Sequence, residues 1–290
     1  MKKYLDEINR IYPELTINEY QKNNLGQNND VIIINQSLVF RFPKYQEGIK
    51  RLIEETTILN CIKGRVNLPI PEPIYQSFNH LEVGKAFTGY KLIKGAPLWV
   101  AQFNNIKDQT VNNNIALDLV TFLTCLHTIP LEECFNLEHI KPVNPKEEMT
   151  ILYNEIIKYI FPFIKKESKD HISQLFETFL NSKACLNIKS TLIHGDFGVT
   201  NILFDQSTSK ISGIIDFGGS CIGDPAYAFA GLLASYGEDF FNQCINLYPS
   251  GFDILERAYF YRGTFPLQEA LHGIKNNDQD AFNNGIKDYI

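Results

Sequence analysis

The chain has 290 residues and a formal net charge of −6 at pH 7, with 44% hydrophobic residues and 12% aromatic residues. This length can hold two lobes with separate cores, and the composition is typical of a folded globular protein. The acidic balance and the lack of a basic block argue against nucleic acid or an anionic membrane as partner, and they fit a cationic ligand. We expect a monomer.

The cysteines carry no motif. All six lie far apart with no C-x-x-C spacing, mostly in or beside apolar runs, which predicts reduced core thiols. The N-terminal stretch contains lysines but no apolar segment of the kind found in export signals. No apolar run reaches the roughly 18 residues needed to span a membrane. We therefore expect a cytoplasmic protein.

The first part of the chain predicts one helix followed by strands. Apolar residues recur at helical spacing from Leu5 to Tyr12, and Pro13 ends that helix. Short runs rich in β-branched and aromatic residues then predict strands, separated by a small polar turn. The predicted strands are Thr16–Tyr20, Val31–Ile34 and Leu38–Phe42, with the turn at Gly26–Asp30 between the first two.

A buried acid is predicted in the next helix. Gly48–Ile62 carries an apolar stripe, and Glu55 lies on it. A carboxylate that faces a core needs a partner to offset its desolvation. Lys44, directly after the third strand, would supply this partner, and Glu54 is the alternative acid for the same lysine.

Prolines and glycines mark the end of the first lobe. Leu68–Pro73 cannot be helical because three prolines alternate with other residues. Ile74–Phe78 and Phe87–Ile93 are predicted strands, and Lys94-Gly95 breaks the second of them. This break is the candidate hinge, which predicts an N-terminal lobe over residues 1–94 and a C-terminal lobe over residues 95–290.

The remainder is predicted to be mainly helical. Apolar stripes and helix-start signals define each helix: an Asn-Pro-x-Glu start at Asn144, an Asp-Pro start at Asp224 and a capping box at Asp253 with Glu256. The expected helices are Ile115–His127, Asn144–Phe161, one around Leu175–Phe179, Asp224–Ala234 and a last long helix after Asp253.

Two acids stand at the ends of short apolar runs. Asp196 follows His194-Gly195, and Asp216 precedes Phe217-Gly218. Because each closes a predicted strand beside a glycine, both are expected in loops where the carboxylates converge at a sheet edge. Asn201 follows Asp196 by five residues. The polar turn at residues 206–210 predicts a hairpin between Asn201 and Asp216.

This combination matches the chemistry of phosphoryl transfer. Kinase-like enzymes use one acid to orient the attacking hydroxyl and accept its proton, and an Asn with a second acid to hold Mg²⁺ against the nucleotide phosphates. Asp196 would be the base, and Asn201 and Asp216 the metal ligands. Either motif alone would be explained as a structural turn, but a turn does not require all three.

The motif His-Gly-Asp-(x)4-Asn, followed by Ile-Ile-Asp-Phe-Gly and Gly223-Asp224-Pro225, resembles the aminoglycoside phosphotransferase superfamily. The resemblance is greatest to the aminoglycoside 2''-phosphotransferases and covers most of the chain. It implies an α+β, two-lobed, protein-kinase-like fold with a small β-rich N-lobe and a larger helical C-lobe. It also implies Mg²⁺, GTP or ATP as phosphoryl donor, and a cationic aminoglycoside antibiotic as acceptor.

The resemblance implies specific nucleotide contacts. The polar turn would lie over the phosphates, the lysine after the third strand would reach the α- and β-phosphates, and the hinge backbone would meet the base. A bulky aromatic just before the hinge resembles members that favour GTP. The nucleotide-binding residues implied are Asn28, Lys44, Glu55, Tyr90, Lys91 and Ile93.

The acceptor is identified only through the resemblance. Family members carry acids after the Gly-Asp-Pro proline, whereas this chain has alanines there, with acids further on. The expected antibiotic-binding acids are Asp224, Glu238, Asp239 and Glu269, although Asp224 could equally act only as a helix cap. A macrolide, an amino alcohol or a sugar is the alternative acceptor. A non-catalytic pseudokinase is a third alternative, and the presence of a proton acceptor opposes it.

Overall fold

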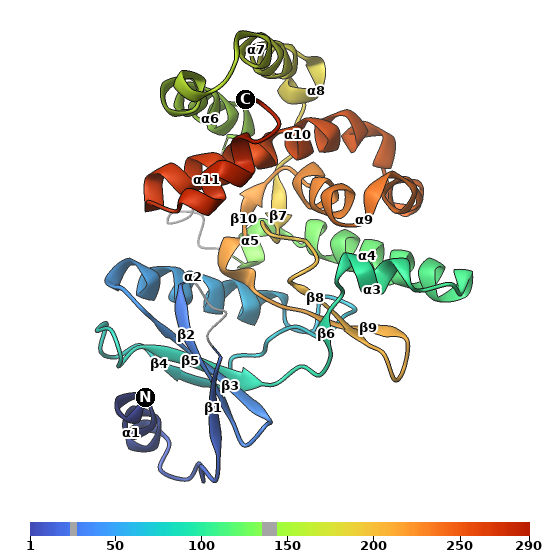
Figure 1. Ribbon diagram of the computed structural model, residues 1–290. Coiled ribbons are helices and arrows are strands. Elements are labelled where there is room, and N and C mark those ends of the chain that lie inside the picture. The colour runs from blue at the N-terminus through green and yellow to red at the C-terminus, as the bar shows by residue number, and fades with distance from the viewer. Residues whose placement is uncertain (24–27, 135–143) are drawn as a thin grey trace. The chain divides into compact units, whose positions relative to one another are not determined.

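A computed structural model describes residues 1–23, 28–134 and 144–290 of the chain (Figure 1). Gly26 and Gln27 of the predicted polar turn lie outside these residues. The described residues form two compact units. The first unit takes its residues from Met1–Asp118, Glu132–Phe135 and Val199–Ser220, and the second from Leu119–Leu131, Asn136–Gly198 and Cys221–Ile290.

The first unit is built on an antiparallel five-stranded sheet in the order β1-β2-β3-β5-β4. Helices α1 and α2 cover its opposite faces (Figure 1). Because side chains alternate along a strand, Phe40 and Phe42 face the core under α1, whereas Arg41 faces α2. The elements are α1 (Lys2–Ile11), β1 (Tyr20–Asn23), β2 (Asn29–Ile34), β3 (Leu38–Pro43), α2 (Gln46–Ile62), β4 (Tyr75–Ser77) and β5 (Phe87–Lys91).

The first strand begins later than predicted. β1 starts at Tyr20, where it pairs with Ile34, so the expected strand at Thr16–Tyr20 is wrong. The Asn35 side chain explains the shift, because its Oδ1 accepts the backbone N–H groups of Asn18 and Glu19 at 2.9 and 3.2 Å. The segment before Tyr20 is therefore bonded to the side chain and backbone of Asn35, in the turn after β2, rather than to a neighbouring strand.

A three-stranded sheet with the order β6-β8-β9 completes the first unit. Its first strand follows Gly95, which has a φ of 123° and leaves no room for a Cβ, since one would lie 2.3 Å from the Ser212 Oγ. The predicted break at Gly95 is confirmed as a point where the chain turns closely over the hairpin. The elements are β6 (Ala96–Pro97), α3 (Val100–Asn104), β8 (Ile202–Asp205), β9 (Lys210–Ile214) and the 3₁₀ turn η2 (Phe217–Gly219).

The second unit is mainly helical, and α4 (Gln109–His127) contributes to both units. Only the pair β7 (Thr191–Ile193) and β10 (Cys221–Gly223) forms a sheet among its described residues. α9 and α10 pack together, and α11 packs along α10 (Figure 1). The helices after α4 are α5 (Leu131–Cys134, mostly in the first unit), α6 (Pro145–Tyr159), η1 (Phe161–Phe163), α7 (Lys166–Leu180), α8 (Lys183–Leu186), α9 (Ala226–Leu247), α10 (Gly251–Asn276) and α11 (Gln279–Ile286).

The predicted helix starts have different outcomes. Asn144 caps α6 as predicted, because its side chain accepts the backbone N–H groups of Lys146 and Glu147. The capping box at Asp253 is wrong, since α10 begins at Gly251 and Asp253 lies inside its first turn. No helix in the described ranges is long and apolar enough to cross a membrane.

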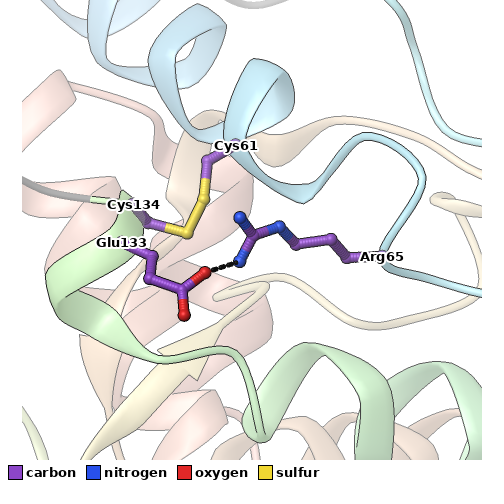
Figure 2. The surroundings of a disulfide bond; sticks show 4 residues. All are labelled: Cys61, Arg65, Glu133 and Cys134. Carbon is purple, nitrogen blue, oxygen red and sulfur yellow. Dashed lines mark hydrogen bonds and ion pairs between the residues drawn. A yellow bond between two sulfur atoms is a disulfide. The ribbon is translucent and has the colours of Figure 1, made fainter.

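The cysteine prediction is wrong for one pair. Cys61 at the end of α2 and Cys134 at the end of α5 form a disulfide, with their Cα atoms 5.2 Å apart (Figure 2). An ion pair between Arg65 and Glu133 lies beside the bond, with an N···O distance of 2.7 Å. The two residues are 73 positions apart, and no local spacing indicates such a pairing. The other four cysteines are free thiols.

His127, in the core of the second unit, makes stability depend on pH. Its Nδ1 lies 2.9 Å from the Tyr248 hydroxyl, and burial lowers its pKa to about 3. Below pH 6.5 the unfolded chain binds a proton that folded His127 does not bind, so the unfolding free energy falls as pH falls, by about 1.4 kcal/mol per unit. We expect His127→Gln to remove this contribution. Denaturant unfolding of both proteins between pH 6.5 and 4 tests this, and a stability difference that is independent of pH would contradict it.

Candidate functional site

Asn201 and Asp216 lie at the same end of the β8–β9 hairpin, which confirms the predicted hairpin. The carbonyl of Asn201 accepts the backbone N–H of Ile215 at 2.9 Å. Asp216 comes next, in a left-handed conformation with a φ of 61°. This conformation costs a non-glycine residue about 1–2 kcal/mol, and such strain is typical of functional sites.

Asp216 is held by an ion-pair network within the first unit. The Arg41 guanidinium pairs with Glu55 through one terminal nitrogen and with Asp216 through the other, at 3.2 Å. Glu55 is only 3% exposed, and it also accepts the backbone N–H of Phe217. One buried acid on α2 therefore fixes both the arginine and the turn that follows Asp216.

The predicted partner of Glu55 was wrong. Glu55 is buried as expected, but its partner is Arg41 rather than Lys44, and the alternative acid Glu54 is exposed. Strand alternation gives the reason, because Arg41 points to the face of β3 that α2 covers, whereas Lys44 lies beyond the end of β3. A charged residue inside the apolar run of β3 was the sequence signal that could have identified Arg41.

The protonation states in this network follow from burial and charge. Burial disfavours the charged form of Arg41, but the neighbouring Glu55 and Asp216 carboxylates outweigh it and raise its pKa. Burial raises the pKa of Glu55, and the Arg41 charge opposes that shift. Since breaking one side of a buried ion pair costs about 3–5 kcal/mol, the buried Arg41–Glu55 pair holds the guanidinium in place, and from there it reaches the half-exposed carboxylate of Asp216.

Lys44 itself is exposed and lies near the start of β2. Its backbone N–H donates to the carbonyl of Asn28 at 3.1 Å. Burial works against ionised Asp30, but hydrogen bonds from Tyr4 and Lys22 and the charge of Lys44 lower its pKa. The Asn28 side chain accepts a hydrogen bond from Tyr45.

The predicted hinge follows β5. The strand ends at Lys91, two residues before the expected end at Ile93, and the Leu92 backbone N–H donates to the Ser37 carbonyl at 2.8 Å. Ile93 packs against Gly213 of β9, where a Cβ would come within 2.7 Å of its side chain. Tyr90, the residue before Lys91, is 8% exposed.

Asp196 lies in the second unit, in the loop after β7, as predicted. It is exposed, and its backbone N–H donates to the Nδ1 of His194 at 3.3 Å. Phe197 anchors the loop by stacking on Phe122, with ring centroids 5.8 Å apart. Gly231 of α9 allows the helix to approach, since a Cβ there would lie 2.2 Å from the Phe197 carbonyl oxygen. The loop is therefore fixed while its acid remains accessible.

Asn201 and Asp216 carry oxygen atoms of the kind that Mg²⁺ prefers as ligands. Among the described residues, no group of three His, Cys, Asp or Glu could hold a metal ion. Mg²⁺ does not require such a group, because it is usually bound through one or two carboxylates together with substrate phosphates and water. The Asp216 side chain is 52% exposed, which leaves room for these further ligands.

The predicted substrate acids fall into two classes. Asp224 is buried, and its carboxylate accepts hydrogen bonds from Arg257, from Tyr261 and from the backbone N–H of Ala226. These contacts join the start of α9 to α10, where the N-cap residue of α9 is Pro225 rather than the predicted Asp224. The exposed acids are Glu238 and Asp239 on α9 and Glu269 on α10.

Comparison with known proteins agrees with this arrangement. A model described as the phosphotransferase enzyme family (APH) matches residues 19–261. Viomycin phosphotransferase of Streptomyces vinaceus is 24% identical, over 100% of this chain and 99% of its own length. The GDP and kanamycin complex of APH(2")-IIia superposes with a TM-score of 0.90 at 25% identity, covering 99% of this chain and 97% of that chain.

A macrolide 2'-phosphotransferase from Brachybacterium faecium has the same fold. Its TM-score is 0.75 at 16% identity, over 98% of each chain. These similarities confirm the predicted kinase-like architecture, with a small antiparallel sheet in one part and helices in the other. The family match covers well over half of the sequence. The chain is therefore an enzyme of the aminoglycoside phosphotransferase (APH) family.

Proposed function

We propose that this enzyme transfers the γ-phosphoryl group of GTP, with ATP as the alternative donor, to a hydroxyl of an aminoglycoside antibiotic and thereby confers resistance. The observation that carries the proposal is the network that fixes Asp216 beside Asn201 at the end of the β8–β9 hairpin. A carboxylate held in this way, at the same hairpin end as an asparagine, suits the Mg²⁺ requirement of phosphoryl transfer. The reaction would take place in the cytoplasm, where nucleoside triphosphates are available.

Each chemical role that phosphoryl transfer requires can be assigned to a residue of this chain. Mg²⁺, held by Asn201 and Asp216, would neutralise charge on the phosphates. Asp196 would orient the acceptor hydroxyl and accept its proton. Asn201 follows Asp196 by only five residues, so their Cα atoms cannot be more than about 18 Å apart.

The positive charge at the nucleotide phosphates, which the sequence analysis expected from Lys44, is assigned here to Arg41. Its buried guanidinium is paired with Glu55 and reaches Asp216, so we propose that it supplies the positive charge nearest the metal and the nucleotide phosphates. Lys44 and Asn28 are bonded to each other through their backbones, and we propose that they line the outer edge of the phosphate site. The backbone from Lys91 to Ile93 would meet the base, beside the ring of Tyr90.

The acceptor is proposed to be cationic. The support is the net charge of −6, the GDP and kanamycin complex of the similar APH(2")-IIia, and the three exposed acids of α9 and α10. Asp224 is assigned a structural role, because Arg257 and Tyr261 occupy its carboxylate. A macrolide is the second candidate, since the helix start after Pro225 carries alanines instead of acids.

Salt dependence distinguishes the two acceptor classes. Exposed ion pairs are screened over about 8 Å at physiological ionic strength, so we expect the acceptor KM to rise several-fold between 50 and 500 mM NaCl (about a tenfold increase in ionic strength). The nucleotide KM serves as the internal control. Neutralising Glu238, Asp239 and Glu269 together should raise the acceptor KM and reduce its salt dependence. A salt-insensitive acceptor KM, with a macrolide preferred over kanamycin, would contradict the proposal.

A further inference from the structure

Tyr90 lies beside Arg41 on the face of the sheet that α2 covers. β3 and β5 are paired so that Arg41 is opposite Thr88 and Val39 is opposite Tyr90. Arg41 and Tyr90 are therefore diagonal neighbours on one face, a spacing that long side chains bridge readily. The two side chains are close enough for the Arg41 charge to act on the phenol, and because a guanidinium has only donors, the Tyr90 oxygen would accept any hydrogen bond between them.

The phenol is a neutral acceptor at physiological pH. Burial raises the pKa of Tyr90 to about 12, helped by the Glu55 and Asp216 charges and opposed by Arg41. A neutral oxygen can bind a guanidinium N–H without adding a third negative charge to the network. Arg41 thus has three acceptors arranged around it, on α2, on β5 and after β9.

We propose that Tyr90 is a positioning residue for the metal and nucleotide site, a role that rests on the function proposed above. Its hydroxyl holds the Arg41 guanidinium in the orientation that reaches Glu55 with one nitrogen and Asp216 with the other. Glu55 anchors the arginine from a buried helix, but Asp216 lies in a turn with a half-exposed side chain. Asp216 therefore depends on the orientation of Arg41, and Arg41 on Tyr90.

The change that isolates this role is Tyr90→Phe. Phenylalanine keeps the aromatic ring, so any contact between the ring and the base is preserved, and only the acceptor oxygen is lost. Hydrogen bonds to charged groups are stronger than those between neutral groups, so we expect the KM for the magnesium nucleotide to rise about tenfold or more. The acceptor KM should change less than about twofold.

Tyr75→Phe is the matched control. Tyr75 lies on β4 in the same sheet but on the opposite face, where its ring packs against Phe40 at 5.3 Å between centroids. Loss of that hydroxyl should leave the nucleotide KM unchanged. A general effect of removing a phenol from the sheet would instead appear in both variants.

A double-mutant cycle with Arg41→Lys tests whether Tyr90 acts through the arginine. Lysine keeps the charge but cannot bridge three acceptors with a planar fork. The tenfold effect of Tyr90→Phe should therefore shrink below about twofold in the Arg41→Lys background. Equal losses in both backgrounds, or no loss in either, would overturn the proposal.

The test does not depend on identifying the acceptor. Calorimetric titration with Mg²⁺ and GDP, without any acceptor, should show the same coupling between Tyr90 and Arg41 in the dissociation constant. Additive dissociation constants would overturn the inference. Failure of the proposed function would appear differently, as wild-type protein that binds Mg²⁺ and GDP with this coupling but phosphorylates no antibiotic.

Discussion

Asp196→Asn is expected to lower kcat by about 10²–10⁴-fold while the dissociation constant for the magnesium nucleotide changes little, because a positioned base acts on the acceptor hydroxyl and not on the nucleotide. Asparagine keeps the shape of the side chain and removes its ability to accept a proton. The neighbouring aromatic contact between Phe122 and Phe197 should preserve the loop. Single-turnover kinetics and nucleotide titration together measure the two quantities.

Asp170→Asn is a suitable control for this experiment. Asp170 is an exposed acid of α7 in the same unit, and it forms an equally exposed ion pair with Lys166, four residues before it. An exposed pair of this kind contributes little, so kcat should remain near the wild-type value. Near-wild-type turnover by Asp196→Asn would remove the assigned role of base.

Loss of the disulfide between Cys61 and Cys134 should lower the unfolding free energy substantially. The bond closes a loop with a sequence separation of 73 residues. Chain entropy in the unfolded state gives about 4 kcal/mol for a loop of this length. The double variant Cys61→Ser/Cys134→Ser should therefore unfold at a clearly lower denaturant concentration than the oxidised wild type, and a reducing agent should have no further effect on it.

Cys125→Ser provides the control, because Cys125 is a free and only half-buried thiol. Its stability should stay close to that of the wild type and should still respond to reduction. The bond itself is checked by counting thiols in the denatured, unreduced protein. Four reactive thiols are expected, corresponding to the four free cysteines, whereas six would contradict the disulfide.

The helices and turns that the sequence predicted correctly are those whose signals lie in residues close together in the chain. The apolar stripe of α2, the Asn144 cap of α6 and the hairpin before Asp216 are confirmed because each depends on neighbouring residues. The position of β1 depends instead on the side chain of Asn35, which follows β2. Competition of that kind between side-chain and strand hydrogen bonds is not visible in the alternation of residues along a strand.

The sequence pointed to the polar residues of the proposed site, but it gave the wrong basic partner for Glu55. Asp196, Asn201 and Asp216 are marked by strand ends and glycines, and a carboxylate on the stripe of α2 indicated a buried pair. The choice between Arg41 and Lys44 depended on which face of β3 is covered by α2, since alternation along the strand places Arg41 on that face. Long-range pairings such as the disulfide and the Asp224–Arg257 contact have no local signal at all.

The most direct test of the proposed function is transfer of labelled phosphate. Purified protein is incubated with GTP labelled on the γ-phosphate, kanamycin and Mg²⁺, and the products are separated and identified by mass. We predict phosphorylated kanamycin that is formed only with Mg²⁺ and is lost in both Asp196→Asn and Asp216→Ala. Labelled inorganic phosphate alone, with kanamycin, gentamicin and other aminoglycosides unmodified, would contradict the central claim.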